Sequence, residues 1–185
     1  MQTETLVKKV AEADFPNPFS RDFKVKVFRN HLDGSENIVI QKGTVRPGES
    51  TLVRVQVENV LGDVFHGGAL DSGGRILGTL AHLAKADSGI FVYLRKEGKN
   101  SLISQHVNLL DDDEFLRKMD SKEYGIGAQI LRALGVQKIK LLANAKPRTS
   151  GIKGFGLEIE EVVPYRPVLW DAKESLSPKP VDATH

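Results

Sequence analysis

A short loop near the middle of the chain, ALDSGG at residues 69–74, groups side chains that could do chemistry. Asp71 offers a carboxylate that could activate water, and Ser72 offers a hydroxyl. Gly73 and Gly74 would let a ligand approach the backbone closely. Apolar residues at helical spacing follow, so we expect the loop at a helix N-terminus. Glycine alone does not identify a ligand, so this is either a catalytic loop or one that has lost its catalytic groups.

Cysteine is absent, which excludes disulfides, thiolate nucleophiles and sulfur-ligated zinc. The five histidines show none of the spacings HxH, HxxxH or HExxH, so spacing predicts no metal site. The 185 residues, 40% hydrophobic and 27% charged, are typical of one globular domain with a substantial core. A net charge of +2 gives no electrostatic reason to expect nucleic acid as a partner. Without a long apolar run or a signal-peptide core, we expect a cytoplasmic protein with no membrane partner.

Hydrophobic periodicity predicts the elements that would position the loop. Alternation at period two in DFKVKVFRN, NIVIQKGTV and STLVRVQVENV favours three antiparallel strands. Further elements are predicted as a helix over 73–86, a strand over 89–95, a helix over 124–134 ended by Gly135, and strands over 137–144 and 157–165. The polar segment 102–123 is expected to be partly helical and could be a mobile flap.

The pattern divides the chain into three parts. Residues 1–21 are expected to be a leader, because the prolines of FPNPF disfavour regular structure. The domain is expected over 22–165. Residues 166–185, rich in proline and charge, are expected to be a tail with little structure.

Four segments, in order, resemble GTP cyclohydrolase II: STLVRVQVENVLGDVF, GIFVYLRKEGKN, EYGIGAQILRALGVQKIKLLAN and GIKGFGLEIEEVVP. The resemblance extends from about Asp22 to Pro164. It implies an α+β fold, with a mixed or antiparallel sheet and flanking helices, in a protein that is usually a homodimer. It also implies an enzyme that opens the imidazole ring of GTP with a zinc-bound water, releasing formate and pyrophosphate on the path to riboflavin.

The family's three zinc-ligand cysteines correspond to Asn59, Leu70 and Ser72. Leucine cannot ligate a metal, and asparagine and serine are weak neutral ligands. The resemblance therefore predicts a domain without zinc or any other cofactor. A metal pair of His66 and Asp71 is an alternative, although a single histidine in a glycine loop is more often solvated.

Positions that the family uses to hold its substrate keep a cationic character here. The resemblance assigns substrate binding to Arg54, Glu58, Arg75, Gly98, Lys99 and Arg148. Positive charge at such points suits phosphate or carboxylate groups. Arg75 stands where the family has glutamine, and Ala143 where it has threonine, so purine recognition is in doubt. Without the resemblance, Arg54 and Glu58 would be interpreted as a strand-surface ion pair of little energetic value.

The family's general base and its proposed arginine nucleophile correspond to Asp120 and Lys122. Lysine keeps the charge but loses the planar fork of arginine. Without the resemblance these would be ordinary charges at a helix start, with Asp120 or Ser121 as the N-cap. Tyr93, in an apolar strand, is expected to belong to the core.

The leading hypothesis is a zinc-independent hydrolase that opens a C–N bond of another cyclic, anionic, heterocyclic or nucleotide-like substrate. Asp120, Glu97 or Asp71 would activate water, and Arg54, Lys99, Lys122 and Arg148 would hold the anion. The alternative is a non-catalytic binding, regulatory or structural homologue linked to flavin or purine metabolism. A GTP cyclohydrolase II with a rebuilt metal site is the second alternative.

Overall fold

A computed structural model of the chain describes residues 5–67, 72–96, 103–108, 121–145 and 152–168. Its centre is a seven-stranded sheet in the order β1-β2-β3-β5-β4-β6-β7. The strands are β1 (Val7–Asp14), β2 (Phe23–Asn30), β3 (Glu36–Lys42), β4 (Ser50–Val57), β5 (Gly89–Leu94), β6 (Lys138–Leu142) and β7 (Glu158–Val163). From β1 through β3 to β5 all neighbours are antiparallel, whereas β5, β4, β6 and β7 run parallel to one another. The expected α+β fold with a mixed sheet is confirmed.

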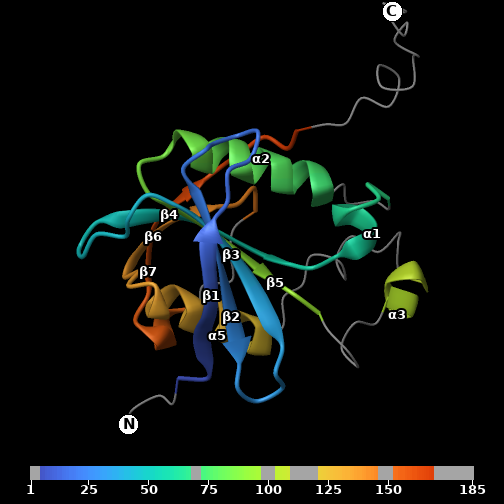
Figure 1. Ribbon diagram of the computed structural model, residues 1–185, viewed down its shortest axis with the longest axis horizontal. Coiled ribbons are helices and arrows are strands. Elements are labelled where there is room, and N and C mark those ends of the chain that lie inside the picture. Colours follow the sequence, from blue (N-terminus) through green and yellow to red (C-terminus); the bar gives the residue numbers. More distant parts are fainter. Residues whose placement is uncertain (1–4, 68–71, 97–102, 109–120, 146–151, 169–185) are drawn as a thin grey trace, which may run out of the picture.

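Helices cover the two faces of this sheet, one above and one below in the view of Figure 1. The helical elements are α1 (Val60–Asp63), α2 (Ser72–Lys85), α3 (Ile103–Asn108), α5 (Ser121–Ala133) and the short 3₁₀ helix η3 (Lys153–Phe155). Helix α2 packs Leu83 into one cluster of buried side chains, and α5 packs Ile130 and Leu131 into the other. No helix in the described part of the chain is long and apolar enough to cross a membrane.

Strand alternation decides which face of the sheet each side chain of β4 occupies. Val53 and its period-two neighbours belong to the cluster beneath α5, whereas Leu52 belongs to the cluster beneath α2. Arg54 and Gln56 share the parity of Leu52, so they lie on the α2 side of the sheet. The alternation of side chains therefore places polar residues of β4 between the sheet and α2.

Two details differ from the sequence-based expectations. Residues 1–21 were predicted as a leader without regular structure, yet Val7–Asp14 forms β1 and pairs with β2. The prolines Pro16 and Pro18 follow the strand rather than interrupt it. The strand in STLVRVQVENV was expected to be antiparallel, but β4 pairs in parallel with both β5 and β6, which come much later in the chain.

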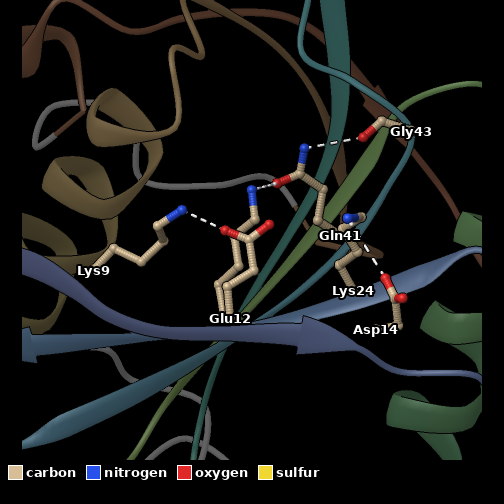
Figure 2. Close-up of polar contacts among 7 residues, drawn as sticks. Lys9, Glu12, Asp14, Lys24, Gln41 and Gly43 are labelled. Atoms are coloured by element: carbon tan, nitrogen blue, oxygen red, sulfur yellow. Dashed lines mark hydrogen bonds and ion pairs between the residues drawn. The ribbon is translucent and has the colours of Figure 1, made fainter.

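The antiparallel half carries a row of polar contacts across its strands (Figure 2). Lys9 contacts Glu12 along β1, and Lys24 on β2 lies 3.5 Å from Asp14. On the next strand pair, Lys26 Nζ donates to Gln41 Oε1 at 2.8 Å. Burial lowers the pKa of Lys26 from its usual value, opposed by the charge of Glu12. These polar contacts belong to the antiparallel half of the sheet, whereas the candidate site lies in the parallel half.

Candidate functional site

The C-terminal ends of β4 and β5 meet at one edge of the sheet because the two strands are parallel neighbours. Glu58 directly follows β4, and its carboxylate accepts a hydrogen bond of 2.8 Å from the backbone N–H of Lys96. Its other oxygen lies 3.6 Å from Arg95 Nε, and the side chain is only 13% exposed. Glu58 therefore ties the two strand ends together. The alternative interpretation of an Arg54–Glu58 ion pair is wrong, since the partner of Glu58 is Arg95.

A buried polar cluster lies next to this edge and centres on Asp63 at the end of α1. One carboxylate oxygen accepts from Gln56 Nε2 at 3.1 Å. The other accepts from the hydroxyl of Tyr93 and, at 2.9 Å, from the backbone N–H of Asn59. Burial, and after it the hydrogen bond to Asp63, raises the pKa of Tyr93. Both oxygens of Asp63 are thus engaged in holding α1 against β4 and β5.

Asn59 is the N-cap of α1. Its Oδ1 accepts a hydrogen bond from the backbone N–H of Gly62 at 3.4 Å, and the residue is 8% exposed. Asparagine is among the preferred N-cap residues because its side chain satisfies an N–H that the helix itself leaves unpaired. The side chain at this position therefore has a structural role.

Arg54 lies on the α2 side of the sheet, where its guanidinium has neutral neighbours. Nη1 donates to the backbone carbonyl of Leu142 at 3.2 Å, and Nη2 lies 3.5 Å from Gln56 Oε1. The ring of Tyr165 lies below the guanidinium, 5.3 Å from ring centroid to Cζ. Burial lowers the pKa of Arg54; Tyr165 opposes this, and the charge of Arg75 lowers it further.

The C-terminal segment is fixed over Arg54 by hydrogen bonds of Asn144. Its side-chain amide accepts from the backbone N–H of Tyr165 and donates to the carbonyl of the same residue, both at 2.9 Å. Further on, the backbone N–H of Val168 donates to the carbonyl of Gly74 on α2 at 2.9 Å. Residues 165–168 therefore connect the edge of the sheet with α2, and residues 166–168, the described part of the predicted tail, form no helix or strand.

Ser72 and Gly73 form the start of α2. Ser72 is 7% exposed, and its Oγ has no hydrogen-bond partner in the part of the chain that the structure describes. A Cβ at Gly73 would lie 2.6 Å from the ring of His66 and 2.8 Å from the carbonyl oxygen of Asp63, so only glycine fits. His66 itself has a left-handed φ of 54°. The helix predicted over 73–86 is confirmed within a residue at each end.

Helix α5 starts near the end of β5. Lys96 Nζ and Glu123 Oε1 form an ion pair of 3.3 Å, with side chains 28% and 18% exposed. Lys122, which was predicted as a catalytic residue, lies 3.4 Å from Asp33 in the turn between β2 and β3 and is 60% exposed. The structure therefore places Lys122 in a surface ion pair rather than among the buried polar groups.

The structure brings Arg54, Gln56, Asn59, Asp63 and Tyr93 into one layer. Of these, Gln56 and Asp63 were not recognised from the sequence. The signal that could have identified them was their position, Gln56 on β4 and Asp63 in the short helix that follows it. The remaining predicted site residues lie outside the described residues: Leu70, Asp71, Glu97, Gly98, Lys99, Asp120 and Arg148.

A family model described as GTP cyclohydrolase II matches residues 8–164. The chain belongs to the GTP cyclohydrolase II family. Three similar relatives carry the name Riboflavin biosynthesis protein RibBA. That of Aquifex aeolicus is 37% identical over 90% of this chain and 44% of its own length. That of Bacillus subtilis is 37% identical over 92% of this chain and 45% of its own length. That of Porphyromonas gingivalis is 34% identical over 89% of this chain and 43% of its own length.

The chain thus spans less than half the length of these curated relatives. Among solved structures, Cfl2 wild-type from Burkholderia cenocepacia aligns with a TM-score of 0.37 and 15% identity, over 69% of this chain and 35% of that chain. This likeness is too low to bear on fold or function. The family assignment rests on the sequence matches.

The zinc site that the GTP cyclohydrolase II family implies does not fit the residues of this chain. Asn59 uses its side-chain oxygen to cap α1, Leu70 has no donor atom, and Ser72 offers a neutral hydroxyl. None of the three supplies the negative charge that a cysteine thiolate gives to zinc. No step of the chemistry proposed below therefore involves a metal.

Proposed function

We propose that this member of the GTP cyclohydrolase II family binds an anionic, nucleotide-like ligand and does not carry out zinc-dependent opening of the imidazole ring of GTP. The observation that carries the proposal is the role of Asn59. Its amide caps α1, and the neighbouring Asp63 accepts hydrogen bonds from Gln56, Tyr93 and a backbone N–H. The position that the resemblance assigns to a zinc ligand thus has another structural use.

Binding without zinc is supported by the charge distribution on this side of the sheet. Arg54 lies on β4 three residues before the strand ends, and the positive charge of Arg75 acts on its guanidinium. In sheets with parallel strands, ligands commonly bind at the carboxyl ends of those strands. An anionic ligand at this edge is the chemistry that these side chains fit.

The test combines metal analysis, a GTP turnover assay and a thermal-shift screen of GTP, other nucleotides and small heterocycles. We expect no stoichiometric zinc, no formate released from GTP, and stabilisation by one class of anionic nucleotide. A ligand at a hundred times its Kd stabilises the native state by about 2.7 kcal/mol, which corresponds to roughly 5–10 °C for a domain of this size. Stoichiometric zinc together with conversion of GTP would refute the proposal.

A matched pair of variants locates the ligand. Glu58→Gln removes a carboxylate, 13% exposed, that lies at the proposed binding edge. Glu49→Gln removes one that is 64% exposed and pairs only with Arg46 among the described residues. The carboxylate of Glu58 would repel an anion bound beside it, so the ligand-induced shift in Tm is expected to grow in the first variant and to stay unchanged in the second. Equal shifts in both variants would place the ligand elsewhere.

The second candidate is a zinc-independent hydrolase of a cyclic anionic substrate. It is favoured by the ion pair of Lys96 with Glu123, which brings together the chain ends that lead to Glu97 and Asp120. One of these carboxylates would take a proton from water as it attacks the ring carbon. Turnover of any heterocycle that disappears in Asp120→Asn supports this candidate, and stoichiometric binding without turnover excludes it.

The proposal includes a homodimer located in the cytoplasm and linked to flavin or purine metabolism. The family resemblance supports the dimer, and the name of the relatives, Riboflavin biosynthesis protein RibBA, supports the link to flavin metabolism. Light scattering of the purified chain, for which one copy has a mass of 20.4 kDa, distinguishes monomer from dimer.

A further inference from the structure

The seven-stranded sheet has two outer edges, and neither edge has a further strand partner among the described residues. β1 forms one edge, and its residues from Lys8 to Asp14 are exposed. β7 forms the other edge, and it is also largely exposed. An exposed edge strand presents unpaired backbone N–H and C=O groups, which can pair with a strand of another chain. Each edge is therefore open to association.

Charge distinguishes the two edges. β7, with the sequence EIEEVV, carries three glutamates and no basic residue. Antiparallel pairing of β7 with a second copy of itself would bring like charges together, which is destabilising. The first half of β1 carries two lysines, Lys8 and Lys9, whereas its second half carries two carboxylates, those of Glu12 and Asp14. An antiparallel second copy of β1 therefore meets the first with opposite charge.

Hydrogen bonds at the two ends of β1 show which of its backbone groups face outward. At one end the N–H of His31 donates to the carbonyl of Leu6 at 2.8 Å. At the other end the N–H of Phe15 donates to the carbonyl of Phe23, also at 2.8 Å. In an antiparallel pair, residues that bond to the partner strand alternate with residues whose backbone groups point away. Applied to the register of β1 on β2, this alternation leaves four residues of β1 facing outward: Val7, Lys9, Glu12 and Asp14.

A β-bulge determines the spacing of these outward-facing residues. The register of β1 on β2 shifts between Lys9 and Ala11, which makes Val10 the extra residue. The outward-facing residues are thus two positions apart on either side of the bulge and three positions apart across it. A two-fold axis between Val10 and Ala11 maps this set onto itself, and Lys9 then lies opposite Glu12 of a second copy. A bulge commonly protects an edge from pairing, but a second copy with the same bulge matches it.

The side chains at this edge are placed for contacts between two copies. Lys9 and Glu12 point to the same side of β1 and contact each other, as Figure 2 shows. Their side chains remain 48% and 32% exposed, so both are accessible to a partner. Across the axis, each Lys9 would lie between Glu12 of its own copy and Glu12 of the second copy. Val10, which is 41% exposed, would lie near the axis and lose apolar surface to water there.

We propose that two copies of this chain associate through antiparallel pairing of their β1 strands, which joins the two sheets into one. The inference rests on the homodimer in the proposed function and gives that dimer its interface. Lys9 of each copy lies opposite Glu12 of the other copy. Opposite charges that face each other across strands stabilise the pairing, and the two-fold axis produces this contact twice.

The experiment measures the mass of the full chain by sedimentation velocity over a range of protein concentrations. Lys9→Glu places like charges opposite each other across the axis, and so does Glu12→Lys. Each substitution turns two attractive contacts into repulsive ones, so we expect the dissociation constant of the dimer to rise about tenfold or more. An equimolar mixture of the two variants restores opposite charges at both contacts, so the mixture is expected to regain the dimer.

Lys8→Glu is the matched control on the same strand. It makes the same change of charge one residue away, but the backbone of Lys8 bonds to β2 and its side chain lies on the other face of the sheet. In the proposed pair it lies opposite Ala13 of the second copy, so we expect this variant to dimerise like the original chain. The thermal transition of each variant checks its folding. Recovery of the dimer in the mixture requires contact between copies, because a local loss of stability would persist there.

The possible failures separate this inference from the proposed function. A monomer at every concentration overturns both the interface and the homodimer, and it leaves the proposed ligand binding unaffected. A dimer that persists unchanged in Lys9→Glu and Glu12→Lys keeps the homodimer and overturns the β1 interface. A dimer that both substitutions disrupt, and that their mixture does not restore, also overturns this interface.

Discussion

Replacing Tyr93 by phenylalanine tests whether the polar cluster around Asp63 holds α1 in place. The substitution removes only the hydroxyl that donates to Asp63, and the acceptor keeps its bonds to Gln56 at 3.1 Å and to the backbone of Asn59 at 2.9 Å. A hydrogen bond to a charged group is worth about 1.5–3 kcal/mol. Since Asp63 keeps two donors, we expect a loss of about 1.5–2 kcal/mol in the free energy of unfolding. For a domain of this size that lowers Tm by roughly 3–8 °C.

The same substitution predicts a change in the pH dependence of stability. Burial and the bond to Asp63 raise the pKa of Tyr93 in the folded chain above its usual value of about 10. Its contribution is therefore fully present below pH 10 and is lost as the pH rises above that value. The stability difference between the original chain and Tyr93→Phe should narrow above pH 10, by at most about 1.4 kcal/mol for each pH unit.

Urea unfolding of both proteins at pH 7, 9 and 10.5, followed by circular dichroism, measures the effect. Tyr124→Phe is the control, because it removes a hydroxyl from α5, outside the cluster around Asp63. Equal stability of Tyr93→Phe and the original chain at pH 7 would refute the reasoning. A stability difference that stays constant from pH 9 to 10.5 would refute its electrostatic part.

Three further substitutions test other contacts by thermal unfolding. Asn59→Ala removes the cap of α1 and should cost about 1 kcal/mol, whereas Asn59→Asp keeps an acceptor and should cost less; equal losses would contradict the capping role. Gly78→Ala places a Cβ 2.4 Å from the backbone carbonyl of residue 166 and should cost about 1–3 kcal/mol, while Gly154→Ala, with nothing within 4 Å, should change little. Lys122→Ala breaks an exposed ion pair of 3.4 Å and should cost less than about 0.5 kcal/mol; a larger loss would show a buried role.

Local signals in the sequence were enough to predict where α5 ends and where β4 lies. Helix α5 ends where expected because Gly135 adopts a φ of 85°, and its N–H and that of Val136 close the helix with bonds to Arg132 and Leu131. Alternation located β4, but it could not give the strand direction. The parallel partners of β4 are β5 and β6, and nothing within the strand itself specifies such distant pairing.

The candidate site was predicted less completely, for geometric reasons. Arg54 and Glu58 lie four residues apart on one extended segment, which separates them by about 13 Å, so they cannot pair. Glu58 instead contacts Arg95 and the backbone N–H of Lys96, which directly follow the neighbouring strand β5. Tyr93 was expected to belong to the core, and it packs, partly buried, against the cluster beneath α2. Its hydroxyl bond to Asp63 depends on the position of α1 relative to β5. Contacts between elements of this kind are set by the tertiary structure.

The contacts around α1 also explain how the fold persists where the zinc ligands of the family are replaced. A metal held at the positions of Asn59 and Ser72 would link the end of β4 to the start of α2. Here hydrogen bonds join the ends of β4 and β5 to α1, through the cap by Asn59 and the bonds of Asp63. Gly73 completes the connection, because its missing side chain lets His66 and the carbonyl of Asp63 approach α2. Since a fold does not by itself imply a function, family membership alone does not establish zinc chemistry in this chain, and the function has to be argued from the arginines and carboxylates that remain.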